Sequence, residues 1–168
     1  MQKTGQGHVR IIAGHLRGSK LPVPDLPGLR PTSDRNRETL FNWLQQAIAG
    51  RTVLDLFAGS GALGFEAASR GAGQVTLVER NPQAVAALLA SKQRLAVGNL
   101  AIVQADALAW LGQQRGPHFD LVFLDPPFAG DIWPTLWPLL VPVLADLALV
   151  SVELPVEREI VLPDGMSL

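Results

Sequence analysis

Residues 53–64 read VLDLFAGSGALG, and this stretch decides the fold. Its first part, residues 53–57, is almost entirely apolar, as is typical of a strand buried inside a parallel sheet. Gly59 and Gly61 allow a tight turn and the close approach of another molecule, and a helix begins after them. Asp55 interrupts the apolar run. A buried carboxylate is costly unless it is hydrogen-bonded or faces a ligand, so either role is open to Asp55.

The glycines of this turn also match G-x-G-x-x-G, the fingerprint of dinucleotide-binding proteins. Glu79 follows Gly59 by 20 residues, which is where such proteins carry a ribose-binding acid. The turn alone therefore leaves a choice between a nicotinamide or flavin cofactor and another nucleoside cofactor.

The composition is that of a single globular domain. The chain has 168 residues, of which 48% are hydrophobic and 17% are charged. The absence of cysteine excludes disulfides and thiol nucleophiles, and the three histidines lack metal-ligand spacing, so no metal site is expected. No apolar run is long enough to span a membrane, and the N-terminus has no signal-peptide core. We therefore expect a cytoplasmic monomer without a membrane partner.

Basic residues are concentrated near the N-terminus. Residues 1–51 carry eight lysines and arginines against three acids, a net charge of +5, whereas the rest of the chain carries −6. This asymmetry favours a contact between the N-terminal part and a polyanion, although a basic surface that only faces solvent is the alternative. We expect residues 1–33 to form a basic extension and residues 34–168 to form the main domain.

The pattern along the chain predicts alternating strands and helices. Two short apolar runs within residues 9–23 favour a β-hairpin. A helix of about 16 residues is expected to begin near Asp34 and to end at Gly50. The further expected strands are 53–57, 74–78, 100–103, 119–124 and 147–152, and the further expected helices are 61–70, 82–95 and 107–111. This alternation predicts an α/β fold with a doubly wound, mostly parallel sheet and a small N-terminal hairpin and helix extension.

Two features of the predicted helices are unusual. Pro134, Pro138 and Pro142 recur every four residues within 132–144, and each internal proline removes a backbone hydrogen bond. We therefore expect this helix to be kinked or broken.

Arg35 and Arg37 fall in the first turn of the helix that is expected to begin near Asp34. Cations at this end oppose the helix dipole, so their placement favours a site for an anion.

Acids follow four of the five predicted core strands. They are Asp55, Glu79, Asp106 and Asp125. Ligands bind beyond the carboxyl ends of the strands in open parallel sheets. A carboxylate after the second strand can accept ribose hydroxyls, and one after the third can accept an adenine amino group. Glu79 and Asp106 taken singly can equally be exposed loop acids, but the joint placement favours a nucleoside site.

The tetrapeptide after the fourth strand is Asp125-Pro126-Pro127-Phe128. Consecutive prolines fix the backbone, so one carboxylate and one carbonyl can point to the same place. Phe128 would offer an aromatic face beside these two acceptors. The arrangement suits a planar heterocycle with an amino group, whereas a proline-rich loop with Phe128 in the core is the alternative.

These motifs resemble those of a known family. DLFAGSGALG, Glu79, Asp106 and DPPF are similar to S-adenosylmethionine-dependent methyltransferases that modify the amino groups of nucleobases. The runs RIIAGHLRGSKLPVP and LRPTSDRNRETLFNWL are very similar to bacterial enzymes that methylate guanine N2 in small-subunit (16S) ribosomal RNA. The resemblance covers residues 9 to about 154. Members of that family continue with a terminal strand pair, so we expect this pair to be missing here and residues 34–168 to be the methyltransferase domain.

The resemblance implies a role for each matching residue. The expected cofactor-binding residues are Asp55, Phe57, Gly59 and Gly61 for the methionine part, Glu79 for the ribose, and Asp106 with Ala107 for the adenine. The expected catalytic residues, which would hold the target guanine, are Asp125, Pro126, Pro127 and Phe128. The residues expected to contact RNA phosphates are Arg10, Arg17, Lys20, Arg30, Arg35 and Arg37.

The resulting hypothesis is methyl transfer from S-adenosylmethionine to the N2 amine of a guanine in 16S ribosomal RNA, with a small-subunit particle as the partner. One alternative is an enzyme that methylates adenine N6 in DNA or in another RNA, since the same tetrapeptide serves that reaction. Another is a dehydrogenase or a non-catalytic nucleotide-binding module built on the glycine turn.

Overall fold

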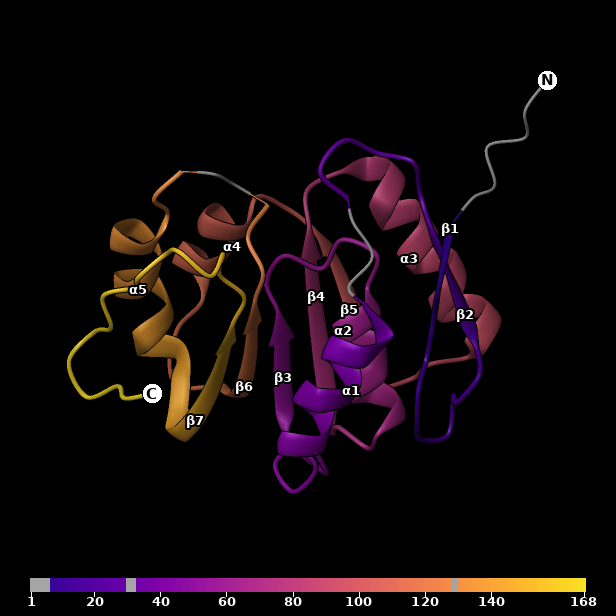
Figure 1. The fold of residues 1–168 in the computed structure, drawn as a ribbon, viewed down its shortest axis with the longest axis horizontal. Coiled ribbons are helices and arrows are strands. Elements are labelled where there is room, and N and C mark those ends of the chain that lie inside the picture. Colours follow the sequence, from indigo (N-terminus) through magenta and orange to yellow (C-terminus); the bar gives the residue numbers. More distant parts are fainter. Residues whose placement is uncertain (1–6, 30–32, 128–129) are drawn as a thin grey trace.

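A central sheet of five parallel strands organises the protein (Figure 1). The computed structural model describes residues 7–29, 33–127 and 130–168. The strands of this sheet are β3 (Thr52–Asp55), β4 (Gln74–Glu79), β5 (Leu100–Gln104), β6 (Phe119–Leu124) and β7 (Leu144–Val152). Their order is β5-β4-β3-β6-β7, and every neighbouring pair is parallel. The chain moves outward from β3 to β5 and then returns to the other side of β3. This creates a switch point between β3 and β6, where such sheets bind ligands.

Helices cover both faces of the sheet. They are α1 (Asp34–Trp43), α2 (Ala62–Ser69), α3 (Pro82–Leu95), α4 (Ala107–Gln113) and α5 (Trp133–Leu140). Successive residues of a strand point to opposite faces, and β3 shows this directly. Val53 belongs to the core cluster under α1, α2 and α3, whereas Leu54 belongs to the cluster under α4 and α5. The predicted doubly wound α/β fold is thus confirmed.

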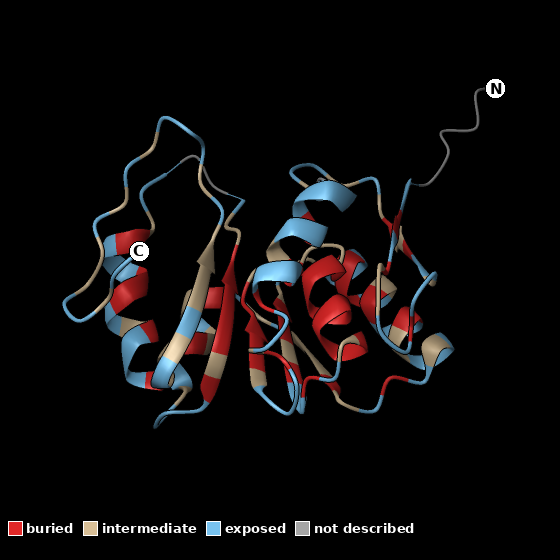
Figure 2. Ribbon diagram, turned by 60° about the horizontal axis from the view of Figure 1, so that its bottom comes forward, coloured by how far each residue is buried: buried red, intermediate tan, exposed pale blue. Residues whose placement is uncertain are grey.

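The glycine turn after β3 is built as its spacing predicts. Gly61 is the N-cap of α2 and has a φ of 81°, a conformation that favours glycine. A Cβ added to Gly61 would lie 2.5 Å from Leu88 of α3, and one added to Gly64 would lie 2.4 Å from Leu77 of β4. The third glycine therefore lets α2 lie close against the sheet. All eight residues of α2 are buried (Figure 2).

The N-terminal segment forms the predicted hairpin. Strands β1 (Gly7–Arg10) and β2 (Lys20–Val23) pair in antiparallel fashion. Figure 1 shows the hairpin beside α3, at the end of the molecule opposite α5. Arg94 of α3 donates a 2.6 Å hydrogen bond to the carbonyl of Lys20. Val9 and Leu21 share a core cluster with the sheet, so the hairpin packs as part of the main body.

Helix α1 is shorter than the sequence predicts. It has ten residues and ends with Leu44 as its C-cap, so the prediction of a continuous helix to Gly50 is wrong. A continuous helix of about 16 residues would extend for about 24 Å, whereas the ten residues of α1 extend for about 15 Å. Turns instead bury Leu44 and Ile48, and Gly50 donates a hydrogen bond to the carbonyl of Gly71. These turns bring the chain back to the start of β3.

The proline-rich segment is interrupted, as predicted. Helix α5 ends at Leu140 and a 3-10 turn, Val141–Val143, carries Pro142. Strand β7 begins at Leu144, earlier than the predicted residue 147, and its register against β6 shifts between Phe119 and Leu121. Leu144 and residues 149–152 have partners on β6, so the strand starts earlier than its pattern indicates and is irregular between these two parts.

Residues 153–168 follow β7 without a helix or strand. Leu154, Ile160 and Leu162 pack against the cluster under α5. The indole of Trp137 donates a 3.1 Å hydrogen bond to the carbonyl of Val161. Among the described residues, no helix combines the length and apolarity that crossing a membrane requires.

Candidate active site

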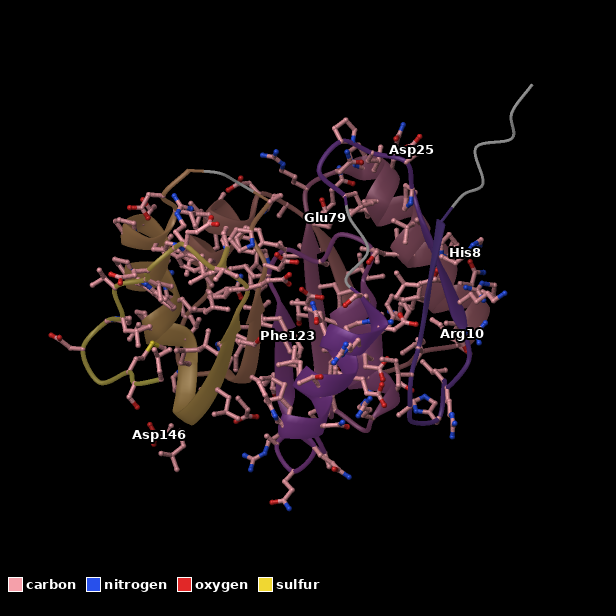
Figure 3. All side chains as sticks on the ribbon, in the orientation of Figure 1. His8, Arg10, Asp25, Glu79, Phe123 and Asp146 are labelled. Carbon is pink, nitrogen blue, oxygen red and sulfur yellow. The ribbon has the colours of Figure 1, made fainter. Side chains whose placement is uncertain are left out.

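A cleft of about 1310 Å³ lies at the carboxyl edge of the sheet. Its wall is formed by the residues that follow β3, β4, β5, β6 and β7, together with the loop 26–29 and the residues that lead into α5. Figure 3 shows Glu79 at this edge and Asp146 at the opposite end of the sheet. The predicted acids Asp55, Glu79, Asp106 and Asp125 all line this one cleft.

Asp55 is buried at the bottom of the cleft, with 2% of its surface exposed. Its Oδ2 accepts a hydrogen bond of 3.1 Å from the backbone N–H of Gly64. Burial, together with the charges of Asp125 and Glu79, raises the pKa of Asp55 to about 7 despite this hydrogen bond. The two roles left open for Asp55 are therefore combined: it is hydrogen-bonded, and it also faces the cleft. A cation bound here would relieve the repulsion among these acids.

Glu79 holds the glycine turn in place. Its two carboxylate oxygens accept backbone hydrogen bonds from Gly59 at 2.8 Å and from Asn81 at 3.0 Å. Gly59 has a φ of 55°, and a Cβ added to it would lie 2.9 Å from Leu29 of the loop that covers the cleft. Glu79 is thus a support of the turn as well as a wall of the cleft, which the sequence pattern does not reveal.

The other predicted cofactor residues differ in their access to the cleft. Asp106 caps α4 by accepting a 3.0 Å hydrogen bond from Ala109, and it lines the cleft with Ala107. Phe57 is half-buried and also lines it. Gly61 is buried outside the cleft wall, so its place in the structure is explained by the packing of α2 against α3.

Asp125 begins the loop after β6, and Pro126 and Pro127 continue the cleft wall. Phe128 lies outside the described residues. Burial, together with the nearby carboxyl of Glu153, raises the pKa of Asp125 to about 6. Sequence reasoning missed Glu153, although it follows the fifth strand as the other acids follow theirs. Applying the same rule to that strand would have found it.

The basic residues divide into exposed and buried ones. Arg10, Arg17 and Lys20 on the hairpin and Arg35 on α1 are exposed, and Figure 3 shows Arg10 on the hairpin. Arg30 lies outside the described residues.

The predicted RNA contact of Arg37 is wrong because this side chain is completely buried. Its Nη2 donates to the carbonyl of Arg10 at 2.8 Å and to Asp34 at 2.7 Å, and its Nη1 lies 3.5 Å from Glu66. The sequence predicted an external anion beside Arg37 at the start of α1. Asp34 and Glu66 of the protein itself supply the negative charge instead.

Glu66 of α2 is the centre of this buried cluster. Its carboxylate accepts hydrogen bonds from the N–H groups of Ile12 and Ala13, at 2.9 and 3.0 Å, and from Arg70 at 2.9 Å. Ser69, one turn later, accepts from the N–H of Leu16 and donates to the carbonyl of Ala13. Through these bonds the hairpin is fastened to the helix that begins at the glycine turn.

Comparison with known proteins agrees with this architecture. The family model described as "Conserved hypothetical protein 95" matches residues 9–167. The chain is 48% identical over 157 residues to the ribosomal RNA small subunit methyltransferase D of Escherichia coli, covering 92% of this chain and 79% of that protein. It is 51% identical over 126 residues to the protein of the same name from Haemophilus influenzae, covering 73% and 65%.

Solved structures give the same result. A putative methyltransferase from Escherichia coli superposes with a TM-score of 0.84 at 46% identity, covering 96% of this chain and 89% of that chain. A putative methylase from Haemophilus influenzae superposes with a TM-score of 0.75 at 38% identity, covering 94% and 88%. The doubly wound fold agrees with these similarities, and they lead to one conclusion: the chain belongs to the family that includes the ribosomal RNA small subunit methyltransferase D proteins.

Proposed function

We propose that this protein transfers a methyl group from S-adenosylmethionine to the exocyclic N2 amine of a guanine in 16S ribosomal RNA. The observation that carries the proposal is that two groups of residues line one cleft. Asp55, the glycine turn and Glu79 would form the half for the cofactor, and Asp125 with Pro126 would form the half for the base. The names of the 48% identical relatives support a small-subunit ribosomal RNA as the substrate.

The residues of the first half fit a cationic cofactor. Asp55, Glu79 and Asp106 give this part of the wall a negative charge, which would repel a pyrophosphate and attract a sulfonium or an ammonium group. Glu79 and Asp106 would hold the ribose and the adenine, and the turn at Gly59 would lie along the amino-acid part. The cofactor supplies an activated methyl group, so the protein has to position the acceptor amine and stabilise its developing charge.

The second half would hold the acceptor amine. The lone pair of the guanine amine is delocalised into the ring. Two acceptors, the Asp125 carboxylate and the Pro126 carbonyl, would take its two hydrogens and favour a pyramidal nitrogen whose lone pair faces the methyl group. The nitrogen becomes cationic as the new bond forms, and the charge of Asp125 would stabilise it. The base must leave its stack to reach the cleft, which favours a loop or a flipped nucleotide.

The exposed cations of the hairpin and α1 would bind the RNA backbone. Arg10, Arg17, Lys20 and Arg35 extend from the surface, and phosphate contacts of this kind orient a nucleic acid without reading its sequence. Because the hairpin is fastened to α2, a backbone bound there would have a fixed position relative to the cleft.

The test is to map the methylated nucleotide. Small-subunit particles, naked 16S RNA and duplex DNA are each incubated with the protein and S-adenosylmethionine labelled in its methyl group, and the labelled base is identified by mass spectrometry. The proposal expects label on guanine N2 of the RNA. Label in DNA, on adenine N6 or on a ring nitrogen would contradict it. Calorimetry with S-adenosylmethionine and NAD is the cofactor control, and only S-adenosylmethionine is expected to bind.

A further inference from the structure

Glu153 lies beside Asp125 at the carboxyl edge of the sheet. Strands β6 and β7 are parallel neighbours, with Leu124 opposite Val152, so the two acids are the next pair in this register. The backbone N–H of Glu153 donates a 2.9 Å hydrogen bond to the carbonyl of Leu124, which continues the pairing to this point. Both side chains line the cleft, and the carboxyl of Glu153 is close enough to raise the pKa of Asp125. The fifth strand thus adds a second acceptor to the half of the cleft assigned to the base.

Two carboxylates that lie side by side repel each other, and this repulsion contributes to the raised pKa of Asp125. Among the described residues, the charged side chains that line the cleft besides this pair are four acids, Asp55, Glu79, Asp106 and Asp131, and one cation, Arg80. Arg158 lies close to this end of the cleft and donates a hydrogen bond to the carbonyl of Gly130. The described wall of the cleft is therefore rich in hydrogen-bond acceptors, and a ligand with two adjacent donors could satisfy Asp125 and Glu153 together.

Guanine presents such a pair of donors. Its N1–H and its N2 amine lie side by side on one edge, pointing in the same direction. Adenine presents an amine next to a ring nitrogen that bears a lone pair and no hydrogen. A second carboxylate beside Asp125 would accept from guanine N1–H, but it would face the lone pair of adenine N1 and repel it. A carboxylate beside Asp125 would therefore favour guanine over adenine.

We propose that Glu153 accepts the N1–H of the target guanine while Asp125 accepts a hydrogen of the N2 amine, which makes Glu153 the residue that selects guanine. This proposal rests on the proposed function and extends it from the reaction to the choice of base. Pairing with two donors also fixes the rotation of the base in its plane, so Glu153 helps to direct the amine toward the methyl group.

The experiment compares guanine with 2-aminopurine, which keeps the 2-amino group but has no hydrogen on N1. Small-subunit particles are assembled from 16S RNA that carries one or the other base at the mapped position. Methyl transfer is measured with the parent protein, with Glu153→Gln and with Asp146→Asn. Asp146 lies on the same strand but at the opposite end of the sheet, so Asp146→Asn matches the loss of charge without touching the cleft.

The parent and Asp146→Asn are expected to prefer guanine by about 100-fold. Glu153→Gln should lower this preference to about tenfold or less, because an amide can accept from guanine N1–H and can also donate to N1 of 2-aminopurine. A residue that only supports the loop would reduce turnover on both bases alike. An unchanged preference in Glu153→Gln would overturn the proposal, as would an equal loss of preference in Asp146→Asn.

The outcome separates this inference from the proposed function. If the parent protein fails to methylate guanine N2, the proposed function is wrong, and the role of Glu153 in choosing guanine is wrong with it. If the parent methylates guanine N2 and Glu153→Gln keeps the full preference, only the role of Glu153 fails. Calorimetry with S-adenosylmethionine on Glu153→Gln, with an expected affinity within about threefold of the parent, shows that the rest of the cleft is intact.

Discussion

Asp55 and Glu66 are two buried acids in opposite circumstances. They are 11 residues apart in the sequence, and their exposed fractions are 2% and 0%. Glu66 accepts hydrogen bonds from two backbone N–H groups and from Arg70, and it pairs with Arg37. Within the part of the chain that the structure describes, Asp55 accepts one hydrogen bond, from Gly64, and its pKa rises to about 7 mainly because of burial.

The difference follows from where each acid lies relative to α2. The turn that leads into α2 leaves Asp55 with few partners and with access to the cleft, whereas the middle of α2 gives Glu66 a full set of partners. A buried charge with complete hydrogen bonding fixes the structure, and a buried charge without it is ready for a ligand. The following predictions test this contrast.

The largest effect is expected from Glu66→Ala. Removal of the carboxylate leaves Arg37 buried without its partner on α2 and two N–H groups of the hairpin unsatisfied. Loss of one partner of a buried ion pair typically costs about 3–5 kcal/mol, and we expect a decrease of that size in the free energy of unfolding. Urea denaturation measures it. The control is Glu38→Ala, which removes an exposed acid of α1 and should change stability by less than about 0.5 kcal/mol. A Glu66→Ala protein as stable as the control would refute the structural role.

Asp125→Asn should affect catalysis and leave the fold intact. The amide removes the charge that would stabilise the cationic amine, so we expect methyl transfer to fall about 100- to 1000-fold. The affinity for S-adenosylmethionine, measured by calorimetry, should stay within about threefold of the parent. Asp146→Asn serves as the matched control and should retain the parental turnover. Near-parental turnover in Asp125→Asn would remove Asp125 from the mechanism.

Asp55→Asn should change the pH dependence of stability. Since the folded-state pKa of Asp55 is raised from 3.8 to about 7, the folded protein holds a proton here that the unfolded chain releases between these values. The stabilisation from this carboxyl is complete below pH 3.8 and is lost as the pH rises through about 7. In the absence of cofactor the parent should lose on the order of 3 kcal/mol over this range from Asp55 alone.

The Asn variant should lack this loss. Its unfolding free energy relative to the parent should therefore increase between about pH 4.5 and about pH 8, as measured by urea denaturation at each pH. The exposed Asp25 offers the control Asp25→Asn, whose pH profile should run parallel to that of the parent. Parallel profiles for Asp55→Asn would show that Asp55 is not a buried acid short of partners.

The smallest effect is expected at the surface. Reversing the charge of Arg17 and Arg35 together should weaken RNA binding by about tenfold at moderate salt and reduce the slope of log affinity against log salt. Filter binding across a salt series measures both quantities. Arg115→Glu changes the charge of an exposed arginine that follows α4, and it should have little effect. If Arg115→Glu weakened RNA binding as much as the reversal at Arg17 and Arg35, the effect would come from net charge and not from a contact at the hairpin and α1.

Local patterns account for the parts of the structure that were predicted correctly. The apolar run before Asp55, the spacing of Gly59 and Gly61 and the hairpin within 9–23 all depend on residues close together in the sequence. The carboxyl-edge rule then brings Asp55 and the later acids into one cleft, because parallel strands end on the same side. These features were predictable because turn conformation depends on a few neighbouring residues, and because alternating strands and helices indicate a parallel sheet.

The failures have a common cause. Arg37 looked like a surface cation because its partner Glu66 lies far along the chain, and the bond from Ile12 to Glu66 joins residues 54 positions apart. The length of α1 depends on where Leu44 and Ile48 meet the core. Neither apolar periodicity nor a short motif predicts contacts between residues that are far apart in the sequence.

The sequence by itself determined the parallel sheet, the glycine turn and the row of acids, because these follow from apolar periodicity and from the conformations that glycine and proline allow. Only the tertiary structure decided which charges are satisfied. It pairs Glu66 with Arg37 in the core, and it places Glu153 beside Asp125 in the cleft. The reason is electrostatic: the effect of a charge depends on its distance from other charges and from water, and both are set only when distant segments pack together.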